Sequence, residues 1–516
     1  MLALCHAPRT RRVFALGYVA GLVHYFSSLY WVLHIPYPPG AICGWLALCT
    51  YCALYPALWV WICWKLFPAT DIAGLTEAWL RLRRMDWRDR VLWPLQCALA
   101  WVALECLRGW LFTGFPWNYL ANSQLDITPL ALFASIGGVL GVSFVVAWCS
   151  IGLLVATTGS IHLKGGSRYI RIAKDFGPAL GLLVAAITSA WLYTESREKQ
   201  LVSRGTIRIA MVQPSIPQQV IFNSLGNDGD ATQQRLEKLV ALTLEANQTQ
   251  PDLIVWPEAS APFGVIRLQE GRIVTRDAGR IAEVLGTPMV IGSDEKVGVL
   301  NGERFEVQMN RNSCFYFDQN STPRAGYSKR HLVMFGEYVP LGDMLPFLRQ
   351  LAPVGTFTPG DGPAVFDLGK AKAAPIICFE DVVPELVRQT AVEEVDFLLN
   401  LTNDGWFGES NQQWQHARTA AFRAIETGRP LVRCTNNGLT CWVDRYGRIH
   451  RLEEGSEYAP GVRVVDLPLH DHTGRRTTIY QRTGDVTGWV SVLAVMLMLG
   501  LRWRTKKVSA EEPDMA

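Results

Sequence analysis

The sequence predicts two kinds of structure in one chain: a polytopic α-helical membrane domain and a soluble α/β domain. Apolar runs dominate the first 200 residues and the last 35, whereas residues 205–470 alternate short β-type runs with helical patterns. About 260 residues are ample for one hydrophobic core. We therefore expect a membrane domain over 1–200, a soluble domain over 205–470 and a final membrane helix over 484–502.

Six stretches are long and apolar enough to cross a bilayer, which takes ~20 residues in a helix. They cover residues 13–33, 40–66, 91–113, 128–158, 176–195 and 484–502, so that five belong to the first domain. The first stretch is too long for a cleavable signal peptide and lacks a small-residue cleavage site. We expect it to remain as an anchor.

Lysine and arginine are distributed unevenly among the connections between these spans. Clusters precede the first span, join the second to the third and the fourth to the fifth, and follow the last, whereas loops 34–39 and 114–127 contain neither residue. Positively charged loops remain in the cytoplasm. Six spans therefore place both termini in the cytoplasm and residues 205–470 on the outer face. The clusters are Arg9, Arg11 and Arg12; Lys65, Arg81, Arg83, Arg84, Arg88 and Arg90; Lys164, Arg168, Arg171 and Lys174; and Arg502, Arg504, Lys506 and Lys507.

Charge and cysteine content exclude two classes of function. The net charge is only +3, and no basic stripe with interleaved aromatic residues is present, so we expect no nucleic-acid partner. Eight of the twelve cysteines lie in or beside the apolar spans, where small thiols are ordinary packing residues. The four in the soluble block form no CxxC or Cys/His spacing, and we expect no metal site. These four are Cys314, Cys378, Cys434 and Cys441.

The soluble block has the pattern of an α/β domain in which helices cover β-sheets. Catalytic residues of such domains lie at strand ends. The β-type runs are 207–212, 253–256, 289–292, 313–317, 374–378, 397–401, 431–434 and 464–466. The helical patterns are 232–247, 275–285, 382–394 and 412–427.

Three residues of this block form a candidate nucleophile set. Cys378 ends an apolar β-type run, Glu258 ends another, and Lys329 follows Tyr327 and Ser328. A thiol is nucleophilic as the thiolate, and an unperturbed pKa near ~8.5 leaves little thiolate at neutral pH. Glu258 would remove the proton if burial raised its own pKa, while Lys329 would favour the thiolate and stabilise an oxyanion. Each residue alone is more often a packing or surface residue, so the prediction depends on the set.

These motifs resemble the carbon–nitrogen hydrolase (nitrilase) superfamily, which has an α-β-β-α sandwich fold and a Glu-Lys-Cys triad. The flanking spans and several further motifs resemble, within it, the apolipoprotein N-acyltransferase family, over nearly the whole chain. The superfamily motifs are Trp256-Pro257-Glu258, Tyr327-Ser328-Lys329, Ile377-Cys378-Phe379-Glu380 and Asn403-Asp404-Gly405-Trp406-Phe407. The family motifs are Leu107-Arg108-Gly109-Trp110, Phe112-Thr113-Gly114-Phe115-Pro116-Trp117 and Phe335-Gly336-Glu337-Tyr338-Val339-Pro340.

The resemblance implies an acyltransferase. Cys378 would take an acyl chain from a membrane phospholipid as a thioester and pass it to the α-amino group of the diacylglyceryl-cysteine of an apolipoprotein, with no cofactor and as a monomer. Glu337, Tyr338 and Glu380 would support the triad or bind substrate, and the backbone N–H of Phe379 would help to hold the oxyanion. The structural alternative is that the two glutamates form ordinary buried ion pairs and that Tyr338 only packs. The chain begins where the third span of such proteins would, and Phe379 stands where they often have Tyr.

Two other functions remain open at this stage. A membrane-tethered amidase would use the same triad with water as the acceptor, and a catalytically inactive sensor or scaffold would only bind lipoproteins. Retention of all three triad residues argues against the scaffold. The flanking spans argue against an amidase for soluble substrates.

Three further features admit a functional and a structural interpretation. Residues 341–360 are apolar but contain three prolines, so they form either a lid that admits an acyl chain or an irregular part of the core. Glu105 and Arg108 share a helical face in the third span, where they meet a lipid headgroup or form a structural pair. Residues 403–406 have the composition of a turn, and we assign them no chemistry.

Overall fold

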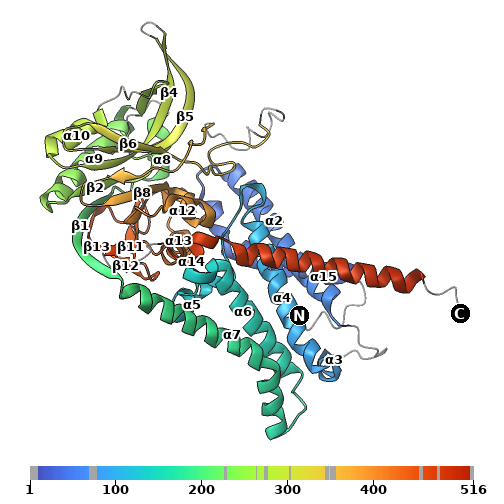
Figure 1. Ribbon diagram of the computed structural model, residues 1–516. Coiled ribbons are helices and arrows are strands. Elements are labelled where there is room, and N and C mark those ends of the chain that lie inside the picture. Colours follow the sequence, from blue (N-terminus) through green and yellow to red (C-terminus); the bar gives the residue numbers. More distant parts are fainter. Residues whose placement is uncertain are drawn as a thin grey trace. The chain divides into compact units, whose positions relative to one another are not determined.

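The computed structural model describes residues 10–68, 78–225, 229–262, 264–271, 273, 277–301, 304–342, 344, 348, 356–452, 457–473 and 477–511 (Figure 1). Its contacts divide the chain into two compact units. The helical unit comprises Met1–Tyr30, Gly44–Ser196 and Arg482–Ala516. The α/β unit comprises Trp31–Cys43 and Arg197–Gln481, so a short segment near the amino end clusters with the distant soluble block.

The helical unit consists of long helices that pack around α4 (Trp87–Arg108) and α6 (Ala134–Thr158). In the most apolar stretch of each of these two helices, 61% of the stretch is buried inside the protein. The corresponding share is 17% in α7 (Gly166–Glu198) and 17% in the apolar part of α15 (Val486–Glu511). Helices that are apolar yet exposed have the composition of membrane spans. The remaining elements are α1 (Thr10–Ser28), α2 (Pro38–Leu66), α3 (Ala78–Arg84), η3 (Leu111–Thr113), η4 (Leu120–Gln124) and α5 (Thr128–Ala131), with η2 (Tyr30–His34) and α14 (Ile479–Thr483) at the boundaries between the units.

Within the described residues, five helices rather than six have the length and composition of membrane spans: α2, α4, α6, α7 and the Val486–Arg504 part of α15. The first predicted span is helical, as α1, but does not reach that hydropathy. Its 19 residues include Arg11, Arg12 and His24, and it ends at Ser28, ahead of the apolar residues up to 33 that the prediction had included. Composition alone therefore does not support the six-span count.

Glu105 and Arg108 both anchor the loop that follows α4. A carboxylate oxygen of Glu105 accepts a hydrogen bond from the backbone N–H of Leu120 at 2.7 Å, and Arg108 donates to the carbonyl of Trp117 at 2.6 Å. Both side chains are buried. These contacts favour the structural interpretation of the two residues.

The described strands of the α/β unit form two sheets with a shared apolar core. The first sheet has the order β13-β1-β2-β4-β5-β6 with β3 beside β4, and the second has the order β12-β11-β10-β9-β8-β7. The first contains β1 (Leu201–Gln213), β2 (Leu253–Trp256), β3 (Val265–Leu268), β4 (Met289–Asn301), β5 (Arg304–Phe317), β6 (Pro323–Ser328) and β13 (Gly461–His472). The second contains β7 (Phe366–Asp367), β8 (Lys372–Ile377), β9 (Phe397–Thr402), β10 (Leu431–Thr435), β11 (Cys441–Val443) and β12 (Ile449–Arg451).

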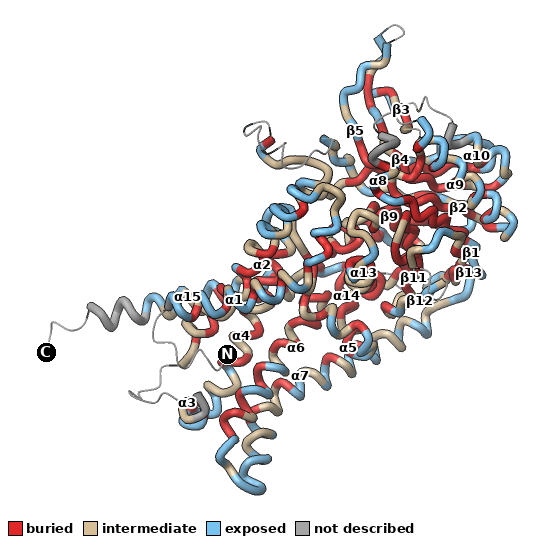
Figure 2. Tube along the Cα trace, turned by 180° about the vertical axis from the view of Figure 1, so that it is seen from behind, coloured by how far each residue is buried: buried red, intermediate tan, exposed pale blue. Residues whose placement is uncertain are grey.

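Helices cover the outer face of each sheet, so the predicted α-β-β-α sandwich is confirmed. One buried cluster unites residues of both sheets, such as Met211 and Val255 with Ile377 and Leu399. A second lies between the first sheet and helices α9 (Gly229–Gln248) and α10 (Asp277–Leu285), whereas α12 (Pro384–Thr390) and α13 (Gln412–Thr427) contact the second sheet. The short elements are α8 (Gln218–Leu225), η5 (Cys378–Val382) and η6 (Asp404–Phe407). Figure 2 shows the buried residues concentrated in the strands of this unit.

Candidate active site

Cys378 lies at a sharp turn between a strand and a helical turn. Strand β8 ends at Ile377, η5 begins at Cys378, and the backbone of Cys378 has a φ of 53°. This left-handed conformation is uncommon for a residue with a Cβ and concentrates at functional sites. The geometry of the turn was not apparent from the sequence, which placed Cys378 as the last residue of the strand.

Glu258 and Lys329 follow two strands of the other sheet and lie close together. Their carboxylate oxygen and ammonium nitrogen are 3.4 Å apart, and Lys329 also lies 2.9 Å from Glu337. Lys329 and Glu258 are 1% and 7% exposed, so both charges are held out of water. The buried ammonium thus pairs with two carboxylates.

Backbone and amide groups fix the two carboxylates. Asn312 Nδ2 donates to Glu258 Oε1 at 2.7 Å and to Glu337 Oε1 at 3.0 Å, and the backbone N–H of Asn403 donates to Glu258 Oε2 at 2.9 Å. Glu337 Oε2 accepts from the backbone N–H of Val333 at 2.9 Å. The turn at Asn403, to which the sequence assigned no chemistry, therefore contacts Glu258 directly.

Burial perturbs the titration of the three groups. Burial raises the pKa of Glu258. The positive charge of Lys329 and the hydrogen bond from Asn312 lower this pKa, whereas the negative charge of Glu337 raises it further. Burial and then the charge of Glu258 raise the pKa of the Cys378 thiol, and Lys329 lowers it. Burial alone would lower the pKa of Lys329, but the carboxylate of Glu337 in particular raises it well above its usual value. The thiol is thus protonated at rest, and the carboxylate of Glu258 is more basic than usual.

Glu380 ties the turn at Cys378 to the segment that carries Lys329. Its Oε2 accepts from the backbone N–H of Ile377 at 2.7 Å and from the hydroxyl of Tyr327 at 2.8 Å. Its Oε1 accepts from the backbone N–H groups of Arg330 at 2.6 Å and His331 at 3.0 Å. The carboxylate is fully buried, and burial raises its pKa. With all these bonds made inside the protein, Glu380 fits a supporting role better than substrate binding.

Phe379 and Tyr338 have different surroundings. The ring of Phe379 stacks on His331 with ring centres 5.8 Å apart, and burial lowers the pKa of His331 to about 4. The carbonyl of Tyr338 accepts from the backbone N–H of Phe335 at 2.8 Å, which closes the loop around Glu337. Phe379 therefore packs beside the nucleophile, and Tyr338 contributes its backbone to the site.

The predicted lid at 341–360 falls largely on residues outside the described ones. Leu341 and Met344 are 61% and 77% exposed. At the other end, the backbone N–H of Phe357 donates to the carbonyl of Glu337 at 3.0 Å, and that of Gly360 to the carbonyl of Lys329 at 2.8 Å. The carboxyl end of the segment is thus attached to the backbone of two site residues.

Two family models match this chain. A family model described as carbon-nitrogen hydrolase matches residues 208–476, and one described as apolipoprotein N-acyltransferase N-terminal domain matches residues 1–152. A solved amidase from Nesterenkonia sp. is 19% identical, with a TM-score of 0.34, and the match covers 52% of this chain and 92% of the amidase. The carbon-nitrogen hydrolase model matches more than half of the chain, and this match assigns the α/β unit to the carbon–nitrogen hydrolases.

Relatives that match both units define the family more closely. A protein of Geobacter metallireducens named apolipoprotein N-acyltransferase is 31% identical over 98% of this chain and 90% of its own length. A protein of Shewanella oneidensis with the same name is 31% identical over 91% of this chain and 82% of its own length. The chain belongs to the apolipoprotein N-acyltransferase family, as the sequence motifs had indicated.

Proposed function

We propose that this protein transfers an acyl chain from a membrane phospholipid to the α-amino group of the diacylglyceryl-cysteine that begins an apolipoprotein. The observation that carries the proposal is a cysteine at a strained turn whose thiol titration responds to the charges of the buried Glu258 and Lys329, which lie 3.4 Å from each other. Membership of the family supplies the lipoprotein substrate. The apolar helices of the other unit fit donor and acceptor lipids that both reside in a bilayer.

The first half-reaction forms a thioester. The Cys378 thiol passes its proton to Glu258, and the sulfur attacks the ester carbonyl carbon of the phospholipid. The Lys329 ammonium, with the backbone N–H of Phe379, stabilises the oxyanion. When the carbon–oxygen ester bond breaks, Glu258 returns the proton to the leaving oxygen. The products are a lysophospholipid and the acyl thioester of Cys378.

The second half-reaction forms an amide. The neutral α-amine of the lipoprotein attacks the thioester carbonyl carbon and gives a proton to Glu258, and the same oxyanion site is used again. The carbon–sulfur bond then breaks, and the proton returns from Glu258 to the sulfur of Cys378. Every proton is conserved, so the two steps need no further reagent.

Four neighbouring residues would support this chemistry. Glu337 would keep Lys329 charged and oriented through their 2.9 Å contact. Glu380 would hold the turn at Cys378 against the segment of Lys329, and Phe379 and Tyr338 would shape the site through packing and backbone contacts. Because the triad comes from one chain, a monomer suffices. We place the protein in the bacterial inner membrane with the α/β unit on the periplasmic face, on the strength of the positively charged loops.

Mass spectrometry after incubation with phospholipid vesicles tests the proposal. We expect one acyl adduct, mapped to Cys378, that persists until a diacylglyceryl-cysteine peptide is added and then appears as N-acyl peptide. The same peptide with a blocked α-amine is the control and should leave the adduct intact. Rapid loss of the adduct as free fatty acid, unaffected by the peptide, would instead indicate a hydrolase. An adduct on Cys314, Cys434 or Cys441 would refute the assignment of the nucleophile.

A further inference from the structure

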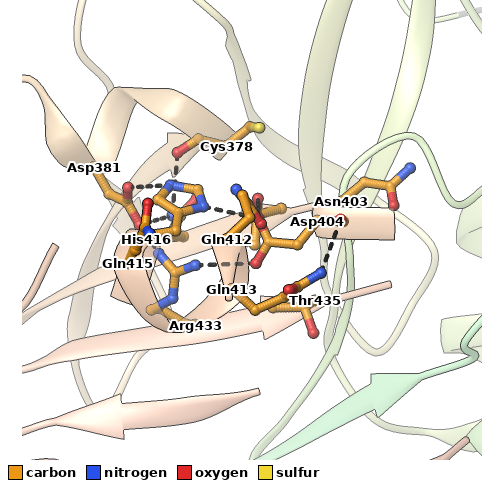
Figure 3. A network of polar contacts seen from close by, with 12 residues as sticks. Cys378, Asp381, Asn403, Asp404, Gln412, Gln413, Gln415, His416, Arg433 and Thr435 are labelled. Atoms are coloured by element: carbon orange, nitrogen blue, oxygen red, sulfur yellow. Dashed lines mark hydrogen bonds and ion pairs between the residues drawn. The ribbon is translucent and has the colours of Figure 1, made fainter. Parts of the chain in front are cut away.

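Four ionisable side chains that the reaction does not use are buried together beneath the nucleophile. Asp381 comes from η5, Asp404 from η6, His416 from α13 and Arg433 from β10, and none is more than 1% exposed. Figure 3 shows them side by side, with the sulfur of Cys378 pointing away from them. We call these four residues the buried charge cluster.

The contacts of the cluster fit two anions and two cations. His416 Nε2 lies 2.7 Å from Asp381 Oδ1, and His416 Nδ1 lies 2.8 Å from Asp404 Oδ1. Only an imidazolium has an N–H on both ring nitrogens, so this ring can donate to both carboxylates only as the cation. Arg433 bonds to Asp381 Oδ2 and lies 3.4 Å from Asp404 Oδ2. The cluster is then neutral as a whole, and removing one member leaves an unpaired buried charge.

One end of the cluster contacts the turn that carries the nucleophile. Asp381 lies within the helical turn that begins at Cys378. Asn400 Nδ2 donates both to Asp381 Oδ2 and, at 3.3 Å, to the carbonyl oxygen of Cys378. Asn400 therefore links the left-handed backbone of Cys378 to the carboxylate of Asp381.

The other end contacts the turn that fixes the base. Asp404 is the residue after Asn403, whose backbone N–H donates to Glu258 Oε2 at 2.9 Å. The carbonyl of Asp404 also accepts from Gln413 of α13 at 3.3 Å. The buried charge cluster thus contacts both the turn that carries Cys378 and the turn at Asn403 that holds Glu258.

We propose that His416 and Arg433 are positioning residues, which hold the turn at Cys378 and the turn at Asn403 at the separation that proton transfer requires. Neither contacts the sulfur, and neither exchanges a proton with substrate. The inference rests on the proposed role of Cys378. A displacement near 1 Å at a reacting pair can lower a rate about 100-fold.

Alkylation of Cys378 by iodoacetamide tests the inference without any lipid substrate, so it remains informative even if the proposed acyl transfer is wrong. We expect His416→Gln in the full-length protein to alkylate at Cys378 about 100-fold more slowly at pH 7, with its pH profile moved to higher pH. The glutamine carries both of its N–H donors on one nitrogen and places an acceptor oxygen in the cluster, so it does not reproduce the two separate donor atoms of the ring. The rate is expressed per folded molecule, from the fraction that resists protease.

Glu426→Gln is the matched control. Glu426 lies on the same helix as His416, is 1% exposed and pairs with Arg423 at 3.0 Å. The substitution breaks a buried ion pair on α13 outside the cluster, so we expect the parental rate and pH profile. An equal loss in Glu426→Gln would show that any damage to α13 suffices, and would overturn the inference.

Two further variants keep the inference testable should His416→Gln fold poorly. Arg433→Lys preserves the positive charge but not the simultaneous contact with Asp381 and Asp404. We expect an alkylation rate between those of the parent and His416→Gln, with a shifted pH profile. In the double variant His416→Gln/Asp404→Asn, the loss should not exceed that of the worse single variant, because the residues act as a unit. Parental rates and profiles in both His416→Gln and Arg433→Lys, or strictly multiplicative losses in the double variant, would refute it.

Discussion

At the scale of single residues, the proposed mechanism depends on how the half-buried thiol of Cys378 loses its proton. Burial and the charge of Glu258 both raise the pKa of Cys378, so the free thiolate is scarce and the proton must move to Glu258 as the bond forms. A serine hydroxyl is far harder to ionise with the same base. We expect Cys378→Ala to abolish the acyl adduct and Cys378→Ser to form traces of it at most, as intact-mass spectrometry would measure. An undiminished adduct in Cys378→Ala would contradict the assignment of Cys378 as the nucleophile.

Glu258→Gln and Lys329→Met test the two partners separately. Each should slow thioester formation by about 100- to 1000-fold, the usual effect of removing a positioned donor or stabilising charge. Lys370→Met is the control, because Lys370 also pairs with an aspartate at 2.6 Å but is 60% exposed. Single-turnover acylation measures all three, and a parental rate in a folded Glu258→Gln or Lys329→Met protein would exclude that residue from the triad.

The pH dependence of acylation follows from the direction of the Glu258 shift. The base acts as the carboxylate, so the rate should fall as the pH drops through the raised pKa of Glu258, above the ordinary value of ~4.3. The charge of Glu337 raises that pKa, so Glu337→Gln should move the acid limb to lower pH. The charge of Lys329 lowers it, so the residual activity of Lys329→Met should show the limb at higher pH. Shifts in the same direction in both variants would contradict this electrostatic account.

Sequence patterns pointed to some residues of the candidate site and not to others, for physical reasons. Glu258 and Cys378 were proposed because each ends an apolar run, and Lys329 because it stands in the motif Tyr327-Ser328-Lys329. Asn312 lies inside a strand, and His416 lies inside an amphipathic helix, where neither has a local signature. Their roles depend on contacts with residues at least 12 positions away in sequence, such as His416 with Asp404.

At the scale of secondary-structure elements, periodicity predicted the regular segments well and the interrupted ones poorly. The helix at 412–427 has the expected bounds, whereas the expected helix at 382–394 is only α12, Pro384–Thr390. The turn after Cys378 occupies 378–382, and Pro384 then starts the helix. The stretch 128–158 divides into α5 and α6, with a left-handed Gly138 inside the latter. Such breaks follow from tertiary packing and backbone geometry, which a hydropathy pattern does not record.

Gly360 offers a test of how the carboxyl end of the 341–360 segment supports the site. A Cβ on Gly360 would lie 2.1 Å from the carbonyl oxygen of Ser328, so the two backbones approach each other as only glycine permits. We expect Gly360→Ala to displace Lys329 and slow acylation at least 10-fold, with a lower melting temperature. Gly362→Ala is the control, because nothing lies within 4 Å of its Cβ position. Equal activity of the two variants would show that the 356–360 backbone does not position Lys329.

The segment Trp31–Cys43 offers a second test at this scale, because it groups with the α/β unit. The ring of Trp31 packs on Phe407 at 4.7 Å and its indole N–H donates to Gln415 at 3.1 Å, beside His416. His34 Nδ1 lies 3.1 Å from the carbonyl of Phe407. We expect Trp31→Ala to slow acylation more than His34→Ala, since it removes packing as well as a hydrogen bond, as single-turnover assays would measure. The reverse order would contradict this contact as a support for the turn at Asn403.

At the scale of the whole molecule, the chain joins a membrane unit to a catalytic unit, and the two were predictable to different degrees. Long apolar stretches indicate spans directly, but α1 has too much polar character to qualify by composition. Whether α1 crosses the membrane decides on which side its arginines lie. The distribution of charge, rather than hydropathy, is therefore the stronger evidence for its topology.

The charge pattern predicts that α1 does cross. The lysine- and arginine-rich connections after α2 and after α6 are expected in the cytoplasm, which puts the start of α2 on the outer face. If α1 did not cross, Arg11 and Arg12 would lie on that outer face as well, against the rule. Reporters fused before Met1 and after Ala516 should therefore both stay cytoplasmic, while protease added to intact spheroplasts should cut within 205–470. If the amino-terminal reporter were external and the carboxyl-terminal reporter cytoplasmic, the chain would have five spans. If residues 205–470 were protected in intact spheroplasts and cut only after lysis, the orientation would be the reverse of the one we propose.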